Sequence, residues 1–365
     1  MELNFFRKRC VGVDIGSKNI KLVSLKPTAQ KKFSLEFWKT VELPDNLVNI
    51  ETPIENKAPI IIDQIKSIYS HKKNLPKSVA ISVSGTPVIV RYIKLPVMTK
   101  EELSKSISLE VEPYIPFPVN EVYLSFDIIG EVLDEGIKKN EVVVAAAKKD
   151  YINAQIDILS QCGLVPKYID VDVFVLENLV NYNYNTENEI MCIVNIGANV
   201  TSVGIIDNGI TKVCRDLPLG MLYILNEMKK NRQLEYKDII NYLKSDGLIL
   251  TDEEKEMYIS QDKKTELMIS KELLSLLKEF STELHKIIDF YYFQKGEQKP
   301  LSKIFLSGGG CIIRNLAEYF SKEFKTEVEI LDPFKNIDNS DDVPSDLRPI
   351  FAVAVGLAMK CYIHR

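Results

Sequence analysis

The sequence predicts an α/β protein built from a duplicated domain, and three glycine-containing segments are the basis for this prediction. The stretches VGVDIGSKNIKLVSL (11–25) and CIVNIGANVTSVGII (192–206) both read as strand, tight turn and strand, and they match at a constant offset. The third segment, FLSGGGCIIRNL (305–316), runs from an apolar strand through three glycines into an expected helix. Two glycine turns are therefore expected to face one another.

Composition describes an ordinary globular chain with no general attraction to nucleic acid or anionic lipid. It has 365 residues, 45% hydrophobic and 27% charged, with a net charge of -5. Its 6 cysteines are scattered without a CxxC pair and it has only 3 histidines, so we expect neither zinc sites nor a disulfide framework. No apolar run approaches the ~20 residues that span a bilayer, and the chain is expected to be cytosolic.

The first half predicts a strand-rich sheet followed by a smaller one. The early sheet comprises two strands around the Gly16 turn, a strand near 33–41, a helix near 58–70 and a strand at 78–83. A small sheet with a helix is then expected, made of a strand at 87–95, an amphipathic helix at 100–111 and strands at 121–130 and 141–147. A helix at 151–162, a strand at 165–171 and a helix at 173–181 complete this half.

The second half starts a sheet over again after the boundary cluster NYNYNTENE. We expect three strands in 190–216, a charged helical region over 221–296 with its longest amphipathic stretch at 266–292, a strand at 302–306 and an apolar helix at 350–359.

Asp14 interrupts the first apolar strand just before its turn, and two interpretations of it are open. In an ordinary hairpin the aspartate stabilises the turn. In a phosphate-binding hairpin it holds a hydrated magnesium ion while the turn amides face phosphates. The triple glycine is open in the same way, because it also fits a plain strand-to-helix connection. Taken together, the three glycine elements favour a nucleotide site.

The order of these elements resembles the actin/Hsp70/hexokinase ATPase superfamily, with phosphate-1 at 13–21, phosphate-2 at 194–202 and the adenosine motif at 306–314. Within this superfamily, three segments are similar to the inserted subdomain of the PilM family, which is related to FtsA. They are RYIKLPVMTKEEL (91–103), EVEPYIPFPVNEV (110–122) and VVVAAAKK (142–149). The resemblance implies an actin-like ATPase fold with four subdomains. These are 1A (1–86 with 169–188 and 345–365), the insert 1C (87–168), 2A (189–224 and 301–344) and 2B (225–300).

The resemblance also implies that the cleft binds ATP and Mg²⁺. Asp14 would be the metal-side carboxylate, and Asp172 would fall near a water-orienting position, although an exposed turn aspartate fits equally well. Glu283 and Lys286 would contact the ribose, or equally be solvated helix residues. The remaining nucleotide-binding positions would be Gly16, Ser17, Lys18, Lys21, Asn195, Gly197, Ala198, Asn199, Gly220, Gly308, Gly309 and Gly310.

Two departures from the family pattern bear on catalysis. Asn195 stands where the family usually has an aspartate, so metal binding should be weaker. The segment DLPLGMLYI (216–224) keeps Gly220 but lacks the second glycine and the threonine often present there. We therefore expect nucleotide binding with slow or no hydrolysis.

The function implied is that of a type IV pilus or secretion scaffold at the inner face of the cytoplasmic membrane, in which ATP sets the angle between the two halves. Its partner would be the N-terminal tail of a PilN-like inner-membrane protein, bound in a groove between 1A and 1C near Arg91, Tyr114, Pro116 and Phe117. Alternatively, these aromatic residues fill the core of 1C. A small-molecule kinase and an FtsA-like filament protein that self-associates are the other functions that this fold allows. The short segment after 350–359 predicts no amphipathic helix, so we do not expect membrane anchoring of the FtsA kind.

Overall fold

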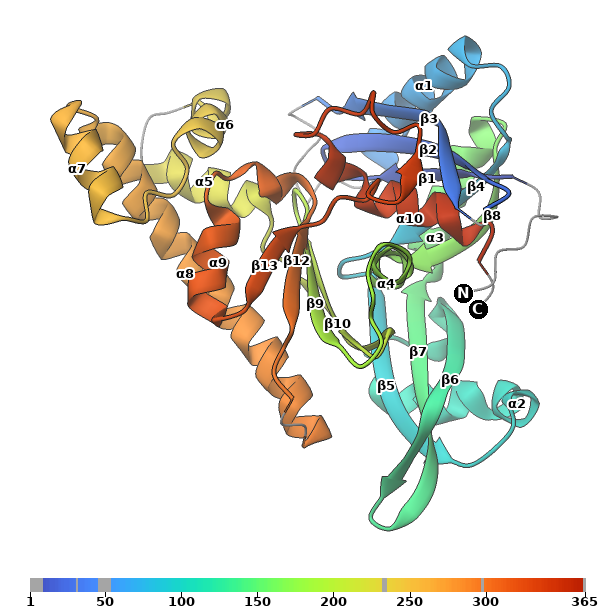
Figure 1. Ribbon diagram of the computed structural model, residues 1–365. Helices are drawn as coiled ribbons and strands as arrows, with labels where there is room; N and C mark the ends of the chain where they lie inside the picture. The colour runs from blue at the N-terminus through green and yellow to red at the C-terminus, as the bar shows by residue number, and fades with distance from the viewer. Residues whose placement is uncertain (1–8, 31, 45–53, 232–234, 297–298, 364–365) are drawn as a thin grey trace.

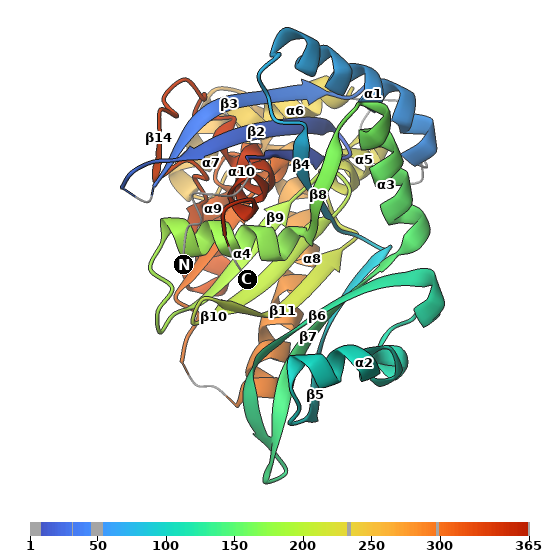
Figure 2. The ribbon, with the colours of Figure 1, turned by 90° about the vertical axis from the view of Figure 1, so that its right-hand side faces the viewer.

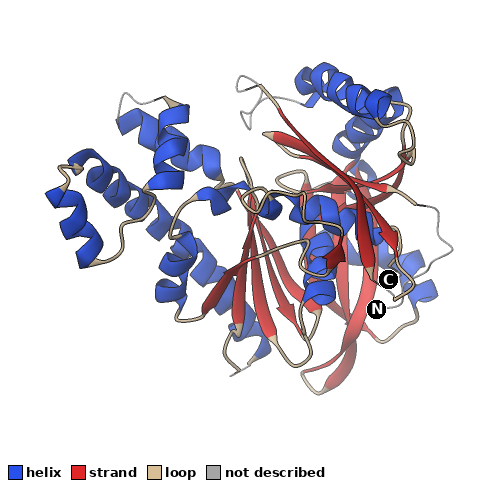
Figure 3. Cartoon of the chain, turned by 45° about the horizontal axis from the view of Figure 1, so that its top comes forward, coloured by secondary structure: helices blue, strands red, loops and turns tan. Residues whose placement is uncertain are grey.

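The computed structural model describes residues 9–30, 32–44, 54–231, 235–296 and 299–363. Three sheets form its framework, two of them large and central, and helices surround them (Figures 1 and 3). Within the described residues, no helix is both long and apolar enough to cross a membrane.

The first large sheet has six strands in the order β14-β3-β2-β1-β4-β8. Helices α1 and α3 cover one of its faces through an apolar cluster that includes Ile65 and Leu159, while α4 and α10 pack on the other. The bounds are β1 Val11–Ile15, β2 Asn19–Pro27, β3 Phe33–Glu42, α1 Ile54–His71, β4 Ser78–Val83, α3 Lys149–Gln161, β8 Val165–Val171, α4 Asp172–Asn183, β14 Ile337–Asp338, η5 Arg348–Phe351 and α10 Ala352–Lys360.

The second large sheet has five strands in the order β11-β10-β9-β12-β13. Helices α5, α6, α8 and α9 pack against it in one continuous apolar cluster, and α8 runs as a long helix along the outer side of this half (Figure 1). The bounds are β9 Ile190–Ile196, β10 Thr201–Asp207, β11 Ile210–Leu217, α5 Met221–Asn231, α6 Tyr236–Ser245, α7 Asp252–Ser260, α8 Lys264–Lys295, β12 Lys303–Ser307, η4 Gly309–Ile312, α9 Leu316–Phe324 and β13 Glu327–Ile330.

The duplication that the sequence predicts is confirmed in the strand register. In the first hairpin Asp14 lies opposite Lys21, and in the second Asn195 lies opposite Ser202. Each first strand also pairs in parallel with the strand that follows on its other side, β1 with β4 and β9 with β12. The two halves therefore have the same local plan, and their hairpin turns are equivalent.

The core of the molecule lies between the two large sheets, where α4 and α10 pack against each other. Close approach needs small residues: a Cβ on Gly12 of β1 would overlap the backbone of Ala354 and Ala358 in α10. Because α10 is buried from Ala352 to Met359, these residues must be apolar on all sides, which explains the sequence AVAVGLAM before the final Lys360. Figure 2 shows both helices beside the sheets of the two halves.

A third, three-stranded sheet is inserted between β4 and α3, in the order β5-β7-β6. Its far end projects away from the two halves (Figure 1). It has its own core, to which Leu103, Ile107 and Val144 contribute. The bounds are β5 Val88–Pro96, α2 Lys100–Val111, η2 Glu112–Tyr114, η3 Val119–Glu121, β6 Val122–Asp134 and β7 Ile137–Lys148. Both ends of the insert thus return to the first large sheet.

Two expectations from the sequence were wrong. The triple glycine does not lead directly into an α-helix: it continues into the short turn η4, and α9 begins only at Leu316, after the left-handed Asn315 (φ 64°). The helix N-terminus is therefore not at the glycines.

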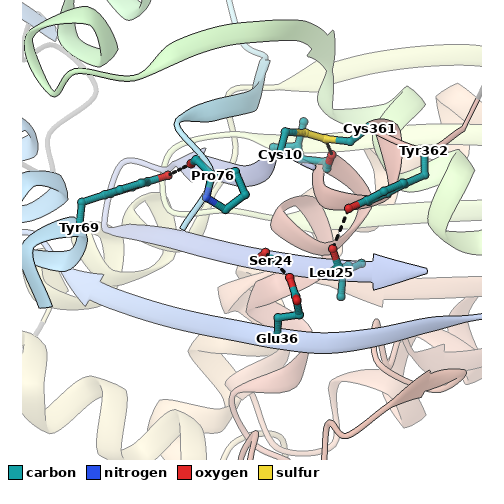
Figure 4. Close-up of a disulfide and its surroundings, with 9 residues drawn as sticks. Cys10, Ser24, Leu25, Glu36, Tyr69, Pro76, Cys361 and Tyr362 are labelled. Atoms are coloured by element: carbon teal, nitrogen blue, oxygen red, sulfur yellow. Dashed lines mark hydrogen bonds between the residues drawn. A yellow bond between two sulfur atoms is a disulfide. The ribbon is translucent and has the colours of Figure 1, made fainter. Parts of the chain in front are cut away.

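The cysteines are also not all unpaired. Cys10 and Cys361 form a disulfide, with their Cα atoms 6.0 Å apart, between the chain just before β1 and the end of α10 (Figure 4). Wide separation in the sequence concealed this pair, because only the fold brings the two segments together. The neighbouring Tyr362 hydroxyl donates to the carbonyl oxygen of Leu25 at 3.0 Å.

One short strand crosses between the halves. Ile337–Asp338 pairs with Phe33 and Ser34 of the first sheet, although the subdomain boundaries expected from the sequence place it in 2A.

Candidate nucleotide-binding cleft

A cleft of about 580 Å³ lies between the two halves, and both glycine hairpins line it. The first half contributes the β1–β2 turn, the end of β4 and the start of α4. The second half contributes the β9–β10 turn, the glycines after β12, and helices α5 and α6. The main lining residues are Asp14, Gly16, Ser17, Lys18, Lys21, Ser82, Ser84, Tyr151, Asp172, Asn195, Gly197, Ala198, Asn199, Ser202, Met221, Leu225, Tyr236, Lys237, Ile240, Asn241, Gly308 and Gly309.

The two hairpin turns have the same backbone geometry. The Gly16 N–H donates to the Asn19 carbonyl oxygen and the Gly197 N–H to that of Val200, both at 3.0 Å. A Cβ on Gly16 would lie 2.9 Å from the Asn19 oxygen, and one on Gly197 would lie 2.7 Å from the Val200 oxygen. Both turns therefore close too tightly for any residue with a side chain.

A charged pair crosses the first hairpin. Lys21 Nζ lies 2.7 Å from Asp14 Oδ2, and the two side chains are only 12% and 15% exposed. Lys18, at the turn itself, pairs with Glu42 at 2.7 Å. This wall of the cleft thus has two carboxylates, Asp14 and Glu42, each paired with a lysine, and such groups can balance a metal ion and phosphates.

The equivalent pair in the second hairpin is uncharged. Asn195 lines the cleft, and its Oδ1 accepts a hydrogen bond from Ser307 Oγ at 3.0 Å. Unlike Asp14 in the first hairpin, it adds no negative charge to the cleft.

Asp172, the first residue of α4, is a carboxyl group in the cleft whose pKa is changed by its surroundings. Burial and the nearby Asp14 raise its pKa to about 6, although hydrogen bonds from the Ser82 and Ser84 hydroxyls oppose the shift. Tyr151 lies close by, and burial together with the Asp172 charge raises its pKa to about 12. Asp172 can therefore accept a proton near neutral pH.

The three consecutive glycines after β12 have two different roles. Gly308 has a left-handed backbone (φ 84°), and a Cβ there would lie 2.5 Å from the Ile196 carbonyl oxygen. A Cβ on Gly310 would overlap the Ile196 side chain. Gly309 has open space where its Cβ would be, and it lines the cleft. The outer glycines fit the turn onto β9, and the middle one leaves room in the cleft.

The structure brings most of the residues expected at the site into the cleft, and places four of them elsewhere. Gly220 packs under the second turn, where a Cβ would lie 2.6 Å from the Ala198 carbonyl carbon, and Gly310 packs on Ile196. Glu283 and Lys286 form an ion pair of 2.6 Å on α8, outside the lining residues.

Sequence reasoning missed the α6 side of the cleft. Helix α6 lines one wall of the cleft with an aromatic ring, a cation, an aliphatic side chain and an amide. These belong to Tyr236, Lys237, Ile240 and Asn241. Their spacing over one helical turn was the available signal, but such spacing is common on any amphipathic helix. Ser82 and Ser84 were missed because nothing in the sequence links β4 to Asp172.

The residues expected to bind a partner lie together on the insert. Arg91 Nε donates to the Tyr114 carbonyl oxygen at 3.0 Å, and the Tyr114 side chain is 46% exposed. Pro116 is exposed as well, whereas Phe117 is half-buried on the core of the insert, with Lys148 Nζ 5.1 Å from its ring centroid. A groove of about 240 Å³ begins at Arg91 and runs between β5 and the end of β11.

Comparison with solved structures shows the same fold. A chain of the PilM-PilN type IV pilus biogenesis complex matches with a TM-score of 0.79 and 23% identity, covering 98% of this chain and 100% of that one. MreB5 of Spiroplasma citri matches in two structures. The one bound to AMPPNP has a TM-score of 0.50 and 12% identity, covering 96% and 94% of the two chains. The one bound to ADP has a TM-score of 0.51 and 13% identity, covering 97% and 95%. The predicted actin-like fold is confirmed.

The sequence also matches a family model, described as "Type IV pilus assembly protein PilM", over residues 12–247 and 250–362. These ranges contain both hairpins, the insert, the glycines after β12 and helix α10. Because the match runs through every part of the fold described above, the chain belongs to the PilM family of type IV pilus assembly proteins.

Proposed function

We propose that the protein is a nucleotide-binding scaffold of type IV pilus assembly that works at the cytoplasmic face of the inner membrane. In this proposal it binds ATP with Mg²⁺ in the cleft and the N-terminal tail of a PilN-like membrane protein on the insert. The cleft lined by both duplicated hairpins is the observation that carries the first part. Family membership and the likeness to a chain of a PilM-PilN complex support the second.

The cleft residues fit a nucleotide triphosphate. Two turns closed by Gly16 and Gly197 present backbone next to the cleft, Lys21 supplies positive charge, and Gly309 leaves a space that a Cβ would occupy. On the α6 wall, Tyr236 and Ile240 offer apolar surface while Lys237 and Asn241 offer polar groups. We assign phosphates to the hairpins and the adenosine to the space between α6 and Gly309.

The site also fits Mg²⁺, held through one carboxylate rather than by a protein cage. Among the described residues, no group of three or more histidine, cysteine, aspartate or glutamate side chains could hold a metal ion. Mg²⁺ is commonly bound by one or two carboxylates, waters and phosphates, and Asp14 supplies such a carboxylate. When bound, the ion would offset phosphate charge. Asn195 adds no charge, so we propose that the metal is held weakly.

Slow hydrolysis follows from the same residues. Asp172 can accept a proton from a water molecule, because its pKa of about 6 leaves it ionised at neutral pH yet basic enough to act. The uncharged Asn195, however, leaves the opposite wall without a second carboxylate. We propose that ATP serves mainly to set the angle between the two halves, with turnover slow or absent.

The proposal is tested by titration calorimetry of nucleotide-free protein with ATP, with and without Mg²⁺, and then with a synthetic tail peptide from the PilN-like protein of the same organism. We expect both ligands to bind, and ATP to bind more tightly with Mg²⁺. A protein that shows neither heat nor thermal stabilisation at millimolar ATP would refute the nucleotide site, because a ligand of the native state must raise its apparent stability. Failure of the tail peptide to bind would refute the proposed partner.

A further inference from the structure

Asp216, near the end of β11, is a half-buried carboxylate that contacts both the turn leading into the insert and a residue of the cleft. It lies opposite Ser202 in the β10–β11 register, and Ser202 lines the cleft. Its Oδ2 accepts the backbone N–H of Gly85 at 2.6 Å, and Gly85 lies on the other half of the molecule, between β4 and the first strand of the insert. The sequence segment DLPLGMLYI begins at Asp216, but its pattern assigned this residue no role.

The contact with Gly85 is made at a turn that starts the insert. Gly85 has a left-handed backbone (φ 82°), and its carbonyl oxygen accepts the Val88 N–H at 2.9 Å as β5 begins. A Cβ on Gly85 would lie 3.5 Å from Val200 Cγ2, in the turn of the second hairpin. The first turn of the insert is thus fixed against the second half by a hydrogen bond and by packing.

The contact with Ser202 leads back to the cleft. The Ser202 hydroxyl donates to Asp216, and Ser202 follows the second hairpin turn on β10. On the other side of Gly85, Ser82 and Ser84 both line the cleft and bond Asp172. The segment that leads into the insert therefore lines the cleft at Ser82 and Ser84, and its next residue, Gly85, donates its N–H to Asp216.

Further contacts make the insert rest on the second half. Lys212 of β11 pairs with Glu141 of β7 at 2.5 Å, with side chains only 16% and 23% exposed. An apolar cluster joins Val90 of β5 to Cys214 of β11. A movement of β10 and β11 relative to the first sheet would therefore be passed to the insert.

We infer that Asp216 is a positioning residue that couples occupancy of the nucleotide cleft to the position of the inserted subdomain, and so to partner binding. A ligand that draws the second hairpin toward the first moves Ser202, and Asp216 carries this movement to Gly85. The inference rests on the proposed function, and adds to it the residue through which the two sites communicate.

The test measures the affinity for the tail peptide without nucleotide and with saturating AMPPNP and Mg²⁺. In the wild type we expect the two affinities to differ by roughly fivefold or more, and by linkage the peptide must change AMPPNP affinity by the same factor. Asp216→Ala should bring this ratio to about one. Asp216→Asn keeps an acceptor oxygen for the Gly85 N–H and should restore an intermediate ratio. Asp207→Asn, at the opposite end of β10 and paired with Lys295, is the matched control and should keep the wild-type ratio.

Amide hydrogen exchange of the segment 84–90 is a second readout that needs no peptide. AMPPNP should change exchange there in the wild type and in Asp207→Asn, but not in Asp216→Ala. If both ligands bind and their affinities are independent, or if Asp216→Ala keeps the wild-type ratio, the inference is overturned while the proposed function stands. If AMPPNP does not bind the wild type, the proposed nucleotide site and the inference fail together.

Discussion

Asp14 has a partner in the structure that the sequence alone did not identify. Because Lys21 lies opposite it in the strand register and 2.7 Å away, the aspartate is already balanced within the hairpin. It stabilises a strand pair rather than the turn itself. Asp14 also lines the cleft close to Asp172, and on this basis we propose it as the carboxylate for a metal ion.

Asp14→Ala should weaken Mg²⁺-dependent ATP binding and leave the fold intact. Loss of a charge-assisted contact typically costs about 1.5–3 kcal/mol, and the freed Lys21 would partly offset this by binding phosphate. Titration calorimetry with and without Mg²⁺ measures the effect, and circular dichroism checks the fold. If the variant bound ATP as the wild type does at both conditions, Asp14 would have only its structural role.

Asp172 predicts a dependence of stability on pH. Its pKa is about 6 in the folded protein, against an ordinary value of 3.8. Between these two pH values the folded protein keeps a proton that the unfolded chain has released, so the free energy of unfolding falls as the pH rises from about 4 to about 6.

Asp172→Asn removes the charge that burial disfavours, so the variant should be stabilised relative to the wild type at pH 7.5 more than at pH 4.5. The gain over the wild type should be larger at pH 7.5 by roughly 2 kcal/mol, measured by denaturant unfolding at both values. Asp157→Asn, on the exposed side of α3, serves as the control. Equal differences from the wild type at the two pH values would show that Asp172 does not carry this charge cost.

At the scale of elements, the turns after β1, β9 and β12 decide the shape of the cleft. Glycine is required in these turns either because a side chain would clash with the tightly packed backbone or because a side chain would fill the cleft. Gly310 belongs to the first case, since a Cβ there would overlap Ile196. Gly309 belongs to the second case, since a Cβ there would meet nothing within 4 Å.

Gly309→Val should lower ATP affinity and keep the melting temperature of the ATP-free protein. Gly310→Ala should instead destabilise the fold, by about 1–3 kcal/mol if it behaves like other overpacked sites. Thermal unfolding and ATP titration of both variants make the comparison. Wild-type ATP affinity in Gly309→Val would place the nucleotide away from this turn.

Most elements could be predicted from the sequence because their patterns are local. The helix at Lys100–Val111 and the strands at Ser78–Val83 and Val165–Val171 have the expected bounds, and the hairpins repeat with the expected register. What could not be predicted depends on contacts between distant segments. The Ser82 hydroxyl bonds Asp172, and α6 forms a cleft wall, only because the two halves are folded against each other.

At the scale of the whole molecule, the insert is attached where the two halves meet. It leaves the first sheet after β4, returns at α3, and contacts the second half through β11. Its exposed Tyr114 is therefore at a position that a change of angle between the halves could alter.

Tyr114→Ala should weaken binding of the PilN-like tail peptide by about tenfold, the loss typical of an exposed aromatic anchor in an interface. Tyr123, also on the insert and similarly exposed at 48%, is the matched control, and Tyr123→Ala should bind as the wild type does. Phe117→Glu should weaken binding too, but it should also lower stability, because the ring packs on the core of the insert. Fluorescence anisotropy gives the affinities, and unchanged binding by Tyr114→Ala would remove this residue from the partner surface.

The bond between Cys10 and Cys361 closes the chain into a covalent ring, with a sequence separation of 351 residues and with both sheets and the insert inside it. Tension applied at these two cysteines would pass through the sulfur atoms and leave the strands unloaded. A pull reaches the folded elements only when it acts at a point within the ring, and the projecting insert is such a point. Mechanical load on the insert would be transmitted through β4 and α3 to the first sheet. The disulfide would meanwhile hold the start of β1 and the end of α10 together.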